Sequence, residues 1–168
     1  MLYEDESDFH LQPLIGNSYS PSGEQTLVPG AGNNRRATCF GALNVDSGEV
    51  TYRFFGRKRA LEFIEFLKHL RTRYPGVPKI VVLDNYSTHR TKAVGQYVKD
   101  HADEFELLYL PTYSPHLNPI EDVWRVVKNA VCRNRFWGDI ETLLAQVRRY
   151  FATKAYKNSI MRKLMRAA

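Results

Sequence analysis

Two short apolar runs, KIVVL at residues 79–83 and FELLY at residues 105–109, constrain the fold of this chain most strongly. The first run is β-branched and lies between Pro78 and Asn85, and the second closes at Pro111, so each is typical of a buried strand. A predicted helix over residues 91–101 lies between them. Two buried strands joined by a helical crossover are parallel neighbours in one sheet, so the pattern predicts an α/β fold.

The segments before this unit predict antiparallel strands. RATCFGALNV and VTYRFFG flank the turn signal DSG and form a predicted hairpin, and MLYEDE at residues 1–6 is a further strand. The stretch from 16 to 34 is rich in Gly, Ser, Pro and Asn and predicts a loop, with QTLV as a candidate short strand inside it. Apolar residues at helical spacing predict the remaining elements, which are helices over 59–74, 119–133 and 139–151 and a short basic helix from Tyr156. We therefore expect one domain over residues 1–168, in which three antiparallel strands and two parallel strands form a mixed sheet flanked by helices.

Composition limits the function. The chain is 43% hydrophobic and 25% charged, with no long apolar run and no secretory signal, so we expect no membrane partner and a cytoplasmic location. Cys39 and Cys132 are isolated and have no C-x-x-C partner, which argues against a cysteine-based zinc framework or a disulfide framework. The net charge of +6 indicates either a polyanionic partner or simply a solvated basic helix face.

Three carboxylates stand where strands or helices begin or end. Asp84 closes the first buried strand, Asp5 lies near the end of the predicted first strand, and Glu121 follows the proline-rich passage YLPTYSPHLNPIEDVW. If the two strands are neighbours, these side chains emerge close together and repel one another unless a cation neutralises them. An all-oxygen site suits Mg²⁺, and such a site on a basic protein suits phosphodiester chemistry.

Each carboxylate also has a purely structural interpretation. Asp84 and Asn85 could form a turn after the strand. Asp5 belongs to an acidic run that could simply be exposed. Glu121 could complete a capping box in which Asn118 is the N-cap and Pro119 the first helical residue.

The segments YEDES, VVLDNYSTH and LPTYSPHLNPIEDVWRVVK together resemble the catalytic domain of DDE transposases from bacterial insertion sequences related to the mariner elements. The resemblance covers nearly the whole chain and is most specific at residues 110–124. It implies an RNase H-like fold and a metal-dependent DNA endonuclease and strand transferase. It also implies two Mg²⁺ or Mn²⁺ ions per site, DNA as the partner rather than a small-molecule substrate, and a homodimer.

Carried over by position, the resemblance makes Asp5, Asp84 and Glu121 the catalytic metal ligands, with Glu6 and Asp8 as less favoured candidates for the place of Asp5. Further residues that would orient the ligands or contact phosphate are Asn85, His89, His116 and Asn118. Basic residues expected to contact DNA phosphates are Arg57, Lys58, Arg59, Arg125, Lys128, Arg133, Arg135, Arg148 and Arg149. Aromatic residues that could stack on an unpaired base are Tyr86, Tyr113 and Trp137, although Trp137 could equally close a helix–helix corner.

Complete members of this family carry helix-turn-helix modules before the catalytic domain, whereas this chain opens on the first catalytic strand. We therefore expect a separate reading frame or a shortened protein without its own end-specific DNA recognition. Two further functions stay open: a catalytically inactive DNA-binding or multimerisation remnant, and a stand-alone nuclease of the same fold acting on RNA or RNA–DNA hybrids.

Overall fold

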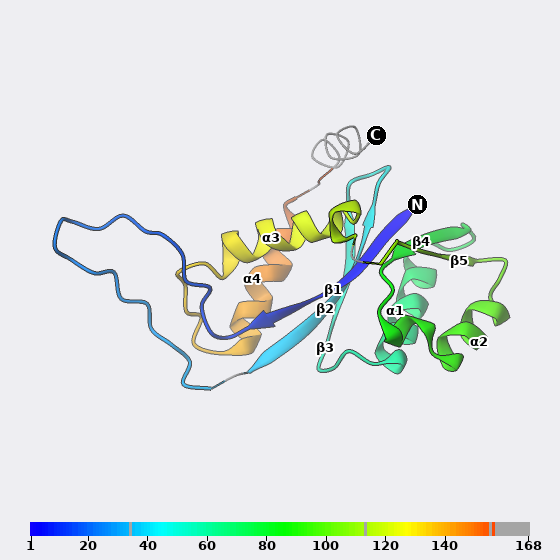
Figure 1. Cartoon of the computed structure of the whole chain (residues 1–168), viewed down its shortest axis with the longest axis horizontal. Helices are drawn as coiled ribbons and strands as arrows, with labels where there is room; N and C mark the ends of the chain where they lie inside the picture. Colours follow the sequence, from blue (N-terminus) through cyan, green and yellow to red (C-terminus); the bar gives the residue numbers. More distant parts are fainter. Residues whose placement is uncertain (34, 113, 155, 157–168) are drawn as a thin grey trace.

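The computed structural model describes residues 1–33, 35–112, 114–154 and 156. Five strands form one mixed sheet in the order β3-β2-β1-β4-β5 (Figure 1). The strands β1, β2 and β3 are antiparallel, and β4 and β5 continue the sheet in parallel from β1. This confirms the predicted fold class. The strands span β1 Leu2–His10, β2 Arg36–Asn44, β3 Val50–Phe55, β4 Lys79–Leu83 and β5 Phe105–Tyr109.

The first strand is longer than predicted. It does not end near Asp5 but continues to His10, paired with β2 along its whole length. The reason is that Ser7 and Phe9 are buried and extend the strand alternation through the acidic run. Parallel pairing of β1 with β4 stops at Tyr3 and Val82, so Asp5 lies in mid-strand, beside the point where β4 runs out.

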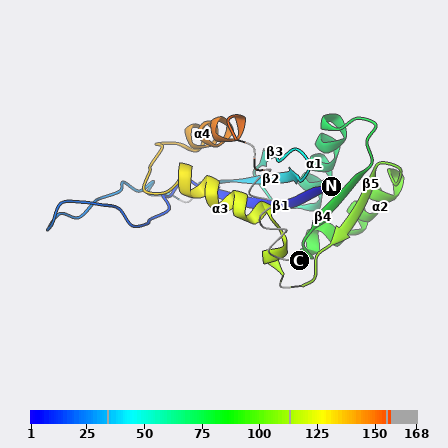
Figure 2. The ribbon, with the colours of Figure 1, turned by 90° about the horizontal axis from the view of Figure 1, so that it is seen from above.

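Helices cover the two faces of the sheet separately (Figure 2). Phe9, Cys39 and Leu43 pack against α3 and α4, while Phe40 and Ala42 pack against α1 and α2. This division follows from the period-2 alternation along β1 and β2. The helices span α1 Ala60–Arg73, α2 Lys92–Asp100, α3 Ile120–Val131 and α4 Ile140–Ala152, with short 3₁₀ turns η1 Ser87–Arg90 and η2 Pro115–Leu117. None of the described helices combines the length and apolarity needed to cross a membrane.

The connection between β1 and β2 extends away from the sheet (Figure 1). Residues 25–28 form no strand, so the QTLV prediction was wrong; within the described residues, no strand lies alongside this segment to supply hydrogen-bond partners. The base of the connection is fixed to the α3–α4 corner, where the Leu14 amide donates to the Cys132 carbonyl and Asn134 bonds Gly16 in both directions. The basic helix predicted from Tyr156 falls almost entirely outside the described residues.

Candidate active site

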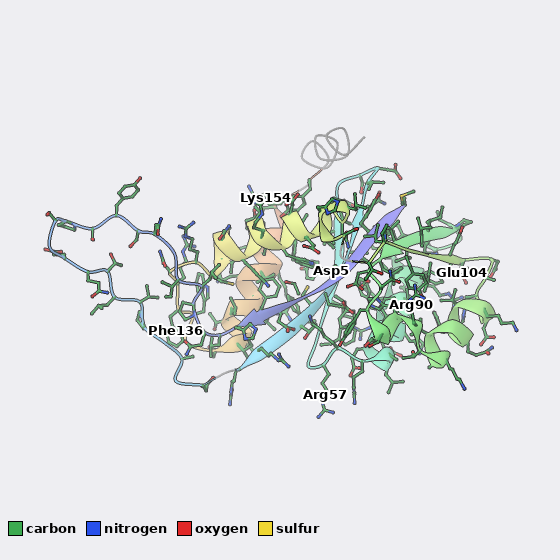
Figure 3. All side chains as sticks on the ribbon, in the orientation of Figure 1. Asp5, Arg57, Arg90, Glu104, Phe136 and Lys154 are labelled. Atoms are coloured by element: carbon green, nitrogen blue, oxygen red, sulfur yellow. The ribbon has the colours of Figure 1, made fainter. Side chains whose placement is uncertain are left out.

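Asp5 lies in the middle of β1, facing α3 (Figure 3). Its Oδ2 accepts a hydrogen bond of 3.0 Å from the Trp124 indole nitrogen. Burial raises the pKa of Asp5 to about 7, and the charges of Glu6, Glu121 and Asp84 contribute to the rise. The carboxyl group therefore sits among other acids in a place where a bound cation would stabilise its ionised form.

Trp124 reaches Asp5 because Gly41 leaves space for it. Gly41 pairs directly with Asp5 across β1 and β2, and a Cβ at Gly41 would lie 2.5 Å from the Trp124 ring. Real Cβ contacts are not this short, so any side chain at this position displaces the indole. Gly41 and Asp5 in the sheet and Trp124 on α3 thus pack together as one unit.

Gly41→Ala should therefore destabilise the protein by about 1–3 kcal/mol, as overpacked core substitutions do. It should also loosen Asp5, because the indole that holds the carboxylate is pushed away. Urea unfolding followed by fluorescence measures the first effect. Gly56→Ala is the matched control, since nothing lies within 4 Å of a Cβ there. Equal stability of the two variants would contradict the packing argument.

Asp84 directly follows β4, and its side chain is half exposed. Its Oδ1 accepts a hydrogen bond of 2.9 Å from the Tyr86 amide, so the structural interpretation as a turn residue is also realised. The same oxygen lies 3.2 Å from His89 Nδ1. This contact lowers the pKa of Asp84, more strongly than burial raises it. Asp84 is therefore ionised and fixed in orientation.

Glu121 is exposed at the second residue of α3. The predicted capping box is wrong, because α3 begins at Ile120 with Pro119 as its N-cap and has no side-chain cap. Asn118 is buried instead, and its Nδ2 donates a hydrogen bond of 2.9 Å to the Glu4 carbonyl in β1. The amide thus ties the start of α3 to the strand that carries Asp5, and this fixes the position of Glu121.

A cavity of about 300 Å³ lies between the end of β4 and the start of α3. Asp84 and Glu121 line it from opposite elements, and Leu110, Pro111, Thr112 and Ser114 of the proline-rich linker form part of its wall. Asn85 and Asn118 complete the lining. The donor set is rich in carboxylate and amide oxygens, which suits Mg²⁺ or Mn²⁺. Asp5 lies outside the lining, but the charges of both cavity carboxylates act on it.

His89 contacts Asp84 through one ring nitrogen and the β1 residues Glu4 and Glu6 through the other. Glu4 and Glu6 lie on the face of the sheet opposite from Asp5 and Trp124. The imidazole is buried, with Nε2 3.1 Å from Glu6 Oε1 and 3.9 Å from Glu4 Oε2. Burial opposes its charge, but the contacts with Asp84 and Glu6 prevail and raise the pKa of His89 to about 11. Sequence reasoning selected His89 and missed Glu4, although Glu4 and Glu6 are two residues apart and so share one face of the strand.

Glu6 and Asp8, the less favoured candidates for the first metal ligand, are engaged by partners away from the cavity. Glu6 contacts His89, and Asp8 accepts a hydrogen bond from Thr38 and pairs with Arg36 and Lys58. Burial and the neighbouring Glu6 also hold the pKa of the missed Glu4 well above its usual range.

The remaining polar candidates differ in their surroundings. Asn85 donates to the Leu110 carbonyl, which joins the end of β4 to the proline-rich linker. Its side-chain oxygen accepts from Arg90. His116 lies exposed in η2, and no contact within the described residues places it at the cavity.

The basic residues predicted to bind DNA lie on three stretches of the surface. Arg57, Lys58 and Arg59 precede α1, and Figure 3 shows Arg57 pointing into solvent, away from α3. Several are engaged with the protein: Arg59 pairs with Glu62, Arg125 with Asp122, and Arg133 donates to the Asn17 carbonyl. The side chain of Lys128 is half-buried, and burial lowers its pKa. Arg135, Arg148 and Arg149 are exposed.

The aromatic residues predicted to stack on a base differ in how exposed their side chains are. Tyr86 is 44% exposed and follows Asp84 by two residues, so it stands beside the cavity. Trp137 packs against the core, and its indole donates to the Val131 carbonyl, as expected for a residue at the α3–α4 corner. Tyr113 lies outside the described residues.

The family model of the DDE superfamily endonucleases matches residues 1–144. The chain belongs to this family. The predicted resemblance to DDE transposases of insertion sequences related to mariner is confirmed.

Among curated proteins, the chain is 32% identical over 154 residues to the insertion element IS630 uncharacterized 39 kDa protein of Shigella sonnei, covering 91% of this chain and 45% of that protein. It is 29% identical over 69 residues to the uncharacterized protein y4pE/y4sA of Sinorhizobium fredii, covering 41% and 47%. The chain thus spans about half the length of the curated relatives it matches.

Solved structures of this DDE fold superimpose over nearly the whole chain. The Mos1 transposase paired-end complex with the left transposon end aligns with a TM-score of 0.76 at 19% identity, covering 98% of this chain and 52% of that one. The catalytic domain of Mos1 mariner transposase aligns with a TM-score of 0.68 at 17% identity, covering 96% and 76%. At these identities the superpositions establish the fold of this DDE family member.

Proposed function

We propose that this chain is the catalytic domain of a DDE transposase, which cleaves DNA phosphodiesters at transposon ends and joins the freed ends to target DNA. One observation carries the proposal: Asp84 and Glu121, from distant parts of the chain, line one cavity, and both act electrostatically on Asp5. Family membership over residues 1–144 supports the same chemistry.

Asp5, Asp84 and Glu121 would hold two divalent ions, Mg²⁺ or Mn²⁺. When bound, such a pair of ions activates an attacking oxygen and stabilises a leaving one. The residues of this chain supply the orientation: Trp124 holds Asp5, and His89 and the Tyr86 amide hold Asp84. A solved neighbour is described as a Mos1 mariner paired-end complex with Mn, which agrees with this choice of metal.

Asn118 and Asn85 act as positioning residues in this proposal. Asn118 ties the start of α3 to β1, and Asn85 ties the end of β4 to the linker at Leu110. Each crosslink joins an element that carries a catalytic carboxylate to the wall of the cavity. His116 would contact phosphate from its exposed position in η2.

DNA is the proposed partner, held mainly by phosphate contacts from the exposed basic residues, with Tyr86 available to stack on a base at the cut. The structural neighbours include Mos1 complexes with a transposon end and a strand transfer complex. We further propose a homodimer acting on DNA in the bacterial cytoplasm, with residues 1–168 as one catalytic domain.

Three substrates separate this function from an inactive remnant and from a stand-alone nuclease of the same fold. Supercoiled DNA, a labelled DNA duplex and an RNA–DNA hybrid are each incubated with the full chain and Mg²⁺ or Mn²⁺. We expect metal-dependent nicking of both DNA substrates and little cleavage of the hybrid. Preferential cleavage of the hybrid would favour the stand-alone nuclease, and binding without cleavage of any substrate would favour the inactive remnant.

A further inference from the structure

Behind the proposed catalytic cavity, β1 carries a second group of acidic side chains that the proposed chemistry does not use. Glu4 and Glu6 alternate with Asp5, so they point to the face of the sheet opposite from Trp124. There they meet His89 from η1. The Glu4 and His89 side chains are 0% and 1% exposed, and that of Glu6 is 4% exposed.

Glu4 is the unusual member of this group. Neither of its carboxylate oxygens has a hydrogen-bond partner anywhere in the described part of the chain. A buried carboxylate without a partner is costly, and buried polar atoms in folded proteins are nearly always satisfied. A further group must therefore offset the free-energy cost of burying the Glu4 carboxylate.

A proton does not satisfy the group. With a proton on Nε2, His89 can donate to Glu6 at 3.1 Å, but Glu4 is 3.9 Å away, beyond hydrogen-bond distance. A proton on Glu4 itself removes the charge but supplies no donor to its remaining acceptor oxygen. A cation placed among the three side chains compensates all of them at once.

The geometry agrees with a metal ion. One ligand atom each from Glu4, Glu6 and His89 lies within 4.8 Å of the others. A tetrahedral ion with bonds of about 2.0–2.1 Å separates its ligand atoms by about 3.4 Å. The two nitrogen–oxygen distances, 3.1 and 3.9 Å, lie on either side of that value.

The other side of the imidazole supplies an independent observation. A histidine that binds a metal through one ring nitrogen nearly always donates its other N–H to a carboxylate or carbonyl. Here Nδ1 lies 3.2 Å from Asp84 Oδ1, an ion-pair contact without hydrogen-bond geometry, so the carboxylate is in place beside Nδ1 and Nε2 is left for the ion. The Phe63 ring lies 4.5 Å from the imidazole and restricts its rotation, and the Tyr109 hydroxyl donates to the His89 carbonyl.

We propose that Glu4, Glu6 and His89 form a buried structural site for a divalent transition-metal ion, Zn²⁺ or Mn²⁺. Two carboxylates with an imidazole favour these ions over Mg²⁺, which prefers oxygen alone. Because the ligands are buried, the ion is taken up as the chain folds and exchanges slowly. The site adjoins the proposed catalytic centre through Asp84, but it holds its ion whether or not the chain cleaves DNA.

Metal content of the refolded protein tests the proposal. The full chain is unfolded in chelator, refolded with Zn²⁺ in excess Mg²⁺, desalted and analysed by mass spectrometry. We expect about one Zn²⁺ per chain, retained in the double variant Asp5→Asn/Glu121→Gln, which removes two proposed catalytic ligands. Retention in that variant separates this site from the proposed function.

Glu4→Gln keeps the shape of the side chain and removes its charge, so it should lower the affinity for Zn²⁺ at least about tenfold. Glu49→Gln, at a glutamate 57% exposed on the β2–β3 turn, is the matched control and should change nothing. At equal concentrations, Zn²⁺ should also raise the melting temperature of the wild-type chain and of Glu49→Gln more than that of Glu4→Gln. No bound Zn²⁺, or binding that Glu4→Gln leaves unchanged, would overturn the proposal.

X-ray absorption of the Zn²⁺-loaded wild-type chain decides the matter even if Glu4→Gln fails to fold. The expected spectrum shows oxygen and nitrogen ligands with the outer-shell scattering of one imidazole. A shell of oxygen atoms alone would place the ion in another site and would contradict the assignment.

Discussion

Asp84→Asn and Glu121→Gln should each lower metal-dependent DNA nicking by about a thousandfold or more, while the fold is retained. A loss of this size corresponds to about 4 kcal/mol of transition-state stabilisation, the scale expected when a metal ligand is lost from a catalytic site. Both side chains lie at the edge of the cavity, half exposed or exposed, so neither substitution disturbs the core. Nicking of supercoiled DNA measured with equal amounts of each variant gives the comparison.

Asp122→Asn is the matched control for Glu121→Gln. Asp122 is the next residue on the same turn of α3, but its carboxylate pairs with Arg125 at 2.8 Å. An exposed pair of this kind contributes little to stability, so this variant should nick DNA at nearly the wild-type rate. If Asp122→Asn were as inactive as Glu121→Gln, or if Asp84→Asn stayed active, the proposed roles of these carboxylates would be wrong.

The second large effect concerns the stability of the metal-free protein. Burial raises the pKa of Asp5 from 3.8 to about 7, so the folded chain binds this proton more tightly than the unfolded chain does. The resulting stabilisation is complete below pH 3.8 and is lost as the pH rises through about 7. The difference corresponds to about 4 kcal/mol at most. The free energy of unfolding, measured in chelator between about pH 4 and pH 8, should therefore fall.

Asp5→Asn should remove the part of this pH dependence that Asp5 contributes and make the metal-free protein more stable than wild type at about pH 8. The asparagine oxygen can still accept the hydrogen bond from Trp124. Glu4 and His89 change stability in the same direction, because burial raises the pKa of Glu4 and the contacts with Asp84 and Glu6 raise that of His89 to about 11, so a smaller slope remains.

Asp84→Asn is the control of opposite sign. The contact with His89 lowers the pKa of Asp84, so its contribution to stability is present above pH 3.8 and is lost as the pH falls. That variant should be less stable than wild type at neutral pH. For the Asp5 prediction itself, the contradicting result is a free energy of unfolding that depends on pH in Asp5→Asn as it does in wild type. That result would show that burial does not disfavour the ionised form of Asp5.

Much of the fold could be predicted because its signals are local. The apolar runs at 79–83 and 105–109, and the helical stripes that became α1, α3 and α4, each carry their own periodicity. The end of β1 could not be predicted, because the acidic residues there look exposed in sequence. Only the pairing partners Ala37 and Thr38 of β2 reveal that β1 continues to Phe9 and beyond.

The site was predicted in part for the same reason. Asp84 lies at the end of a strand and Glu121 at the start of a helix, and proline and asparagine residues in the sequence mark both boundaries. Only the capping interpretation of Asn118 was wrong, because the sequence shows a local cap while the folded chain offers a partner 114 residues away. Gly41 and Glu4 were missed, since their importance depends on what the neighbouring strand or helix places against them.

The position of Mn²⁺ in crystals of the wild-type chain tests the central claim most directly. Anomalous scattering at the manganese edge should place at least one ion in contact with oxygen atoms of Asp5, Asp84 and Glu121 together. The same crystals of Glu121→Gln should show that peak weakened or absent. Carboxylates that stay too far apart to share an ion, with no manganese peak between them, would contradict the account.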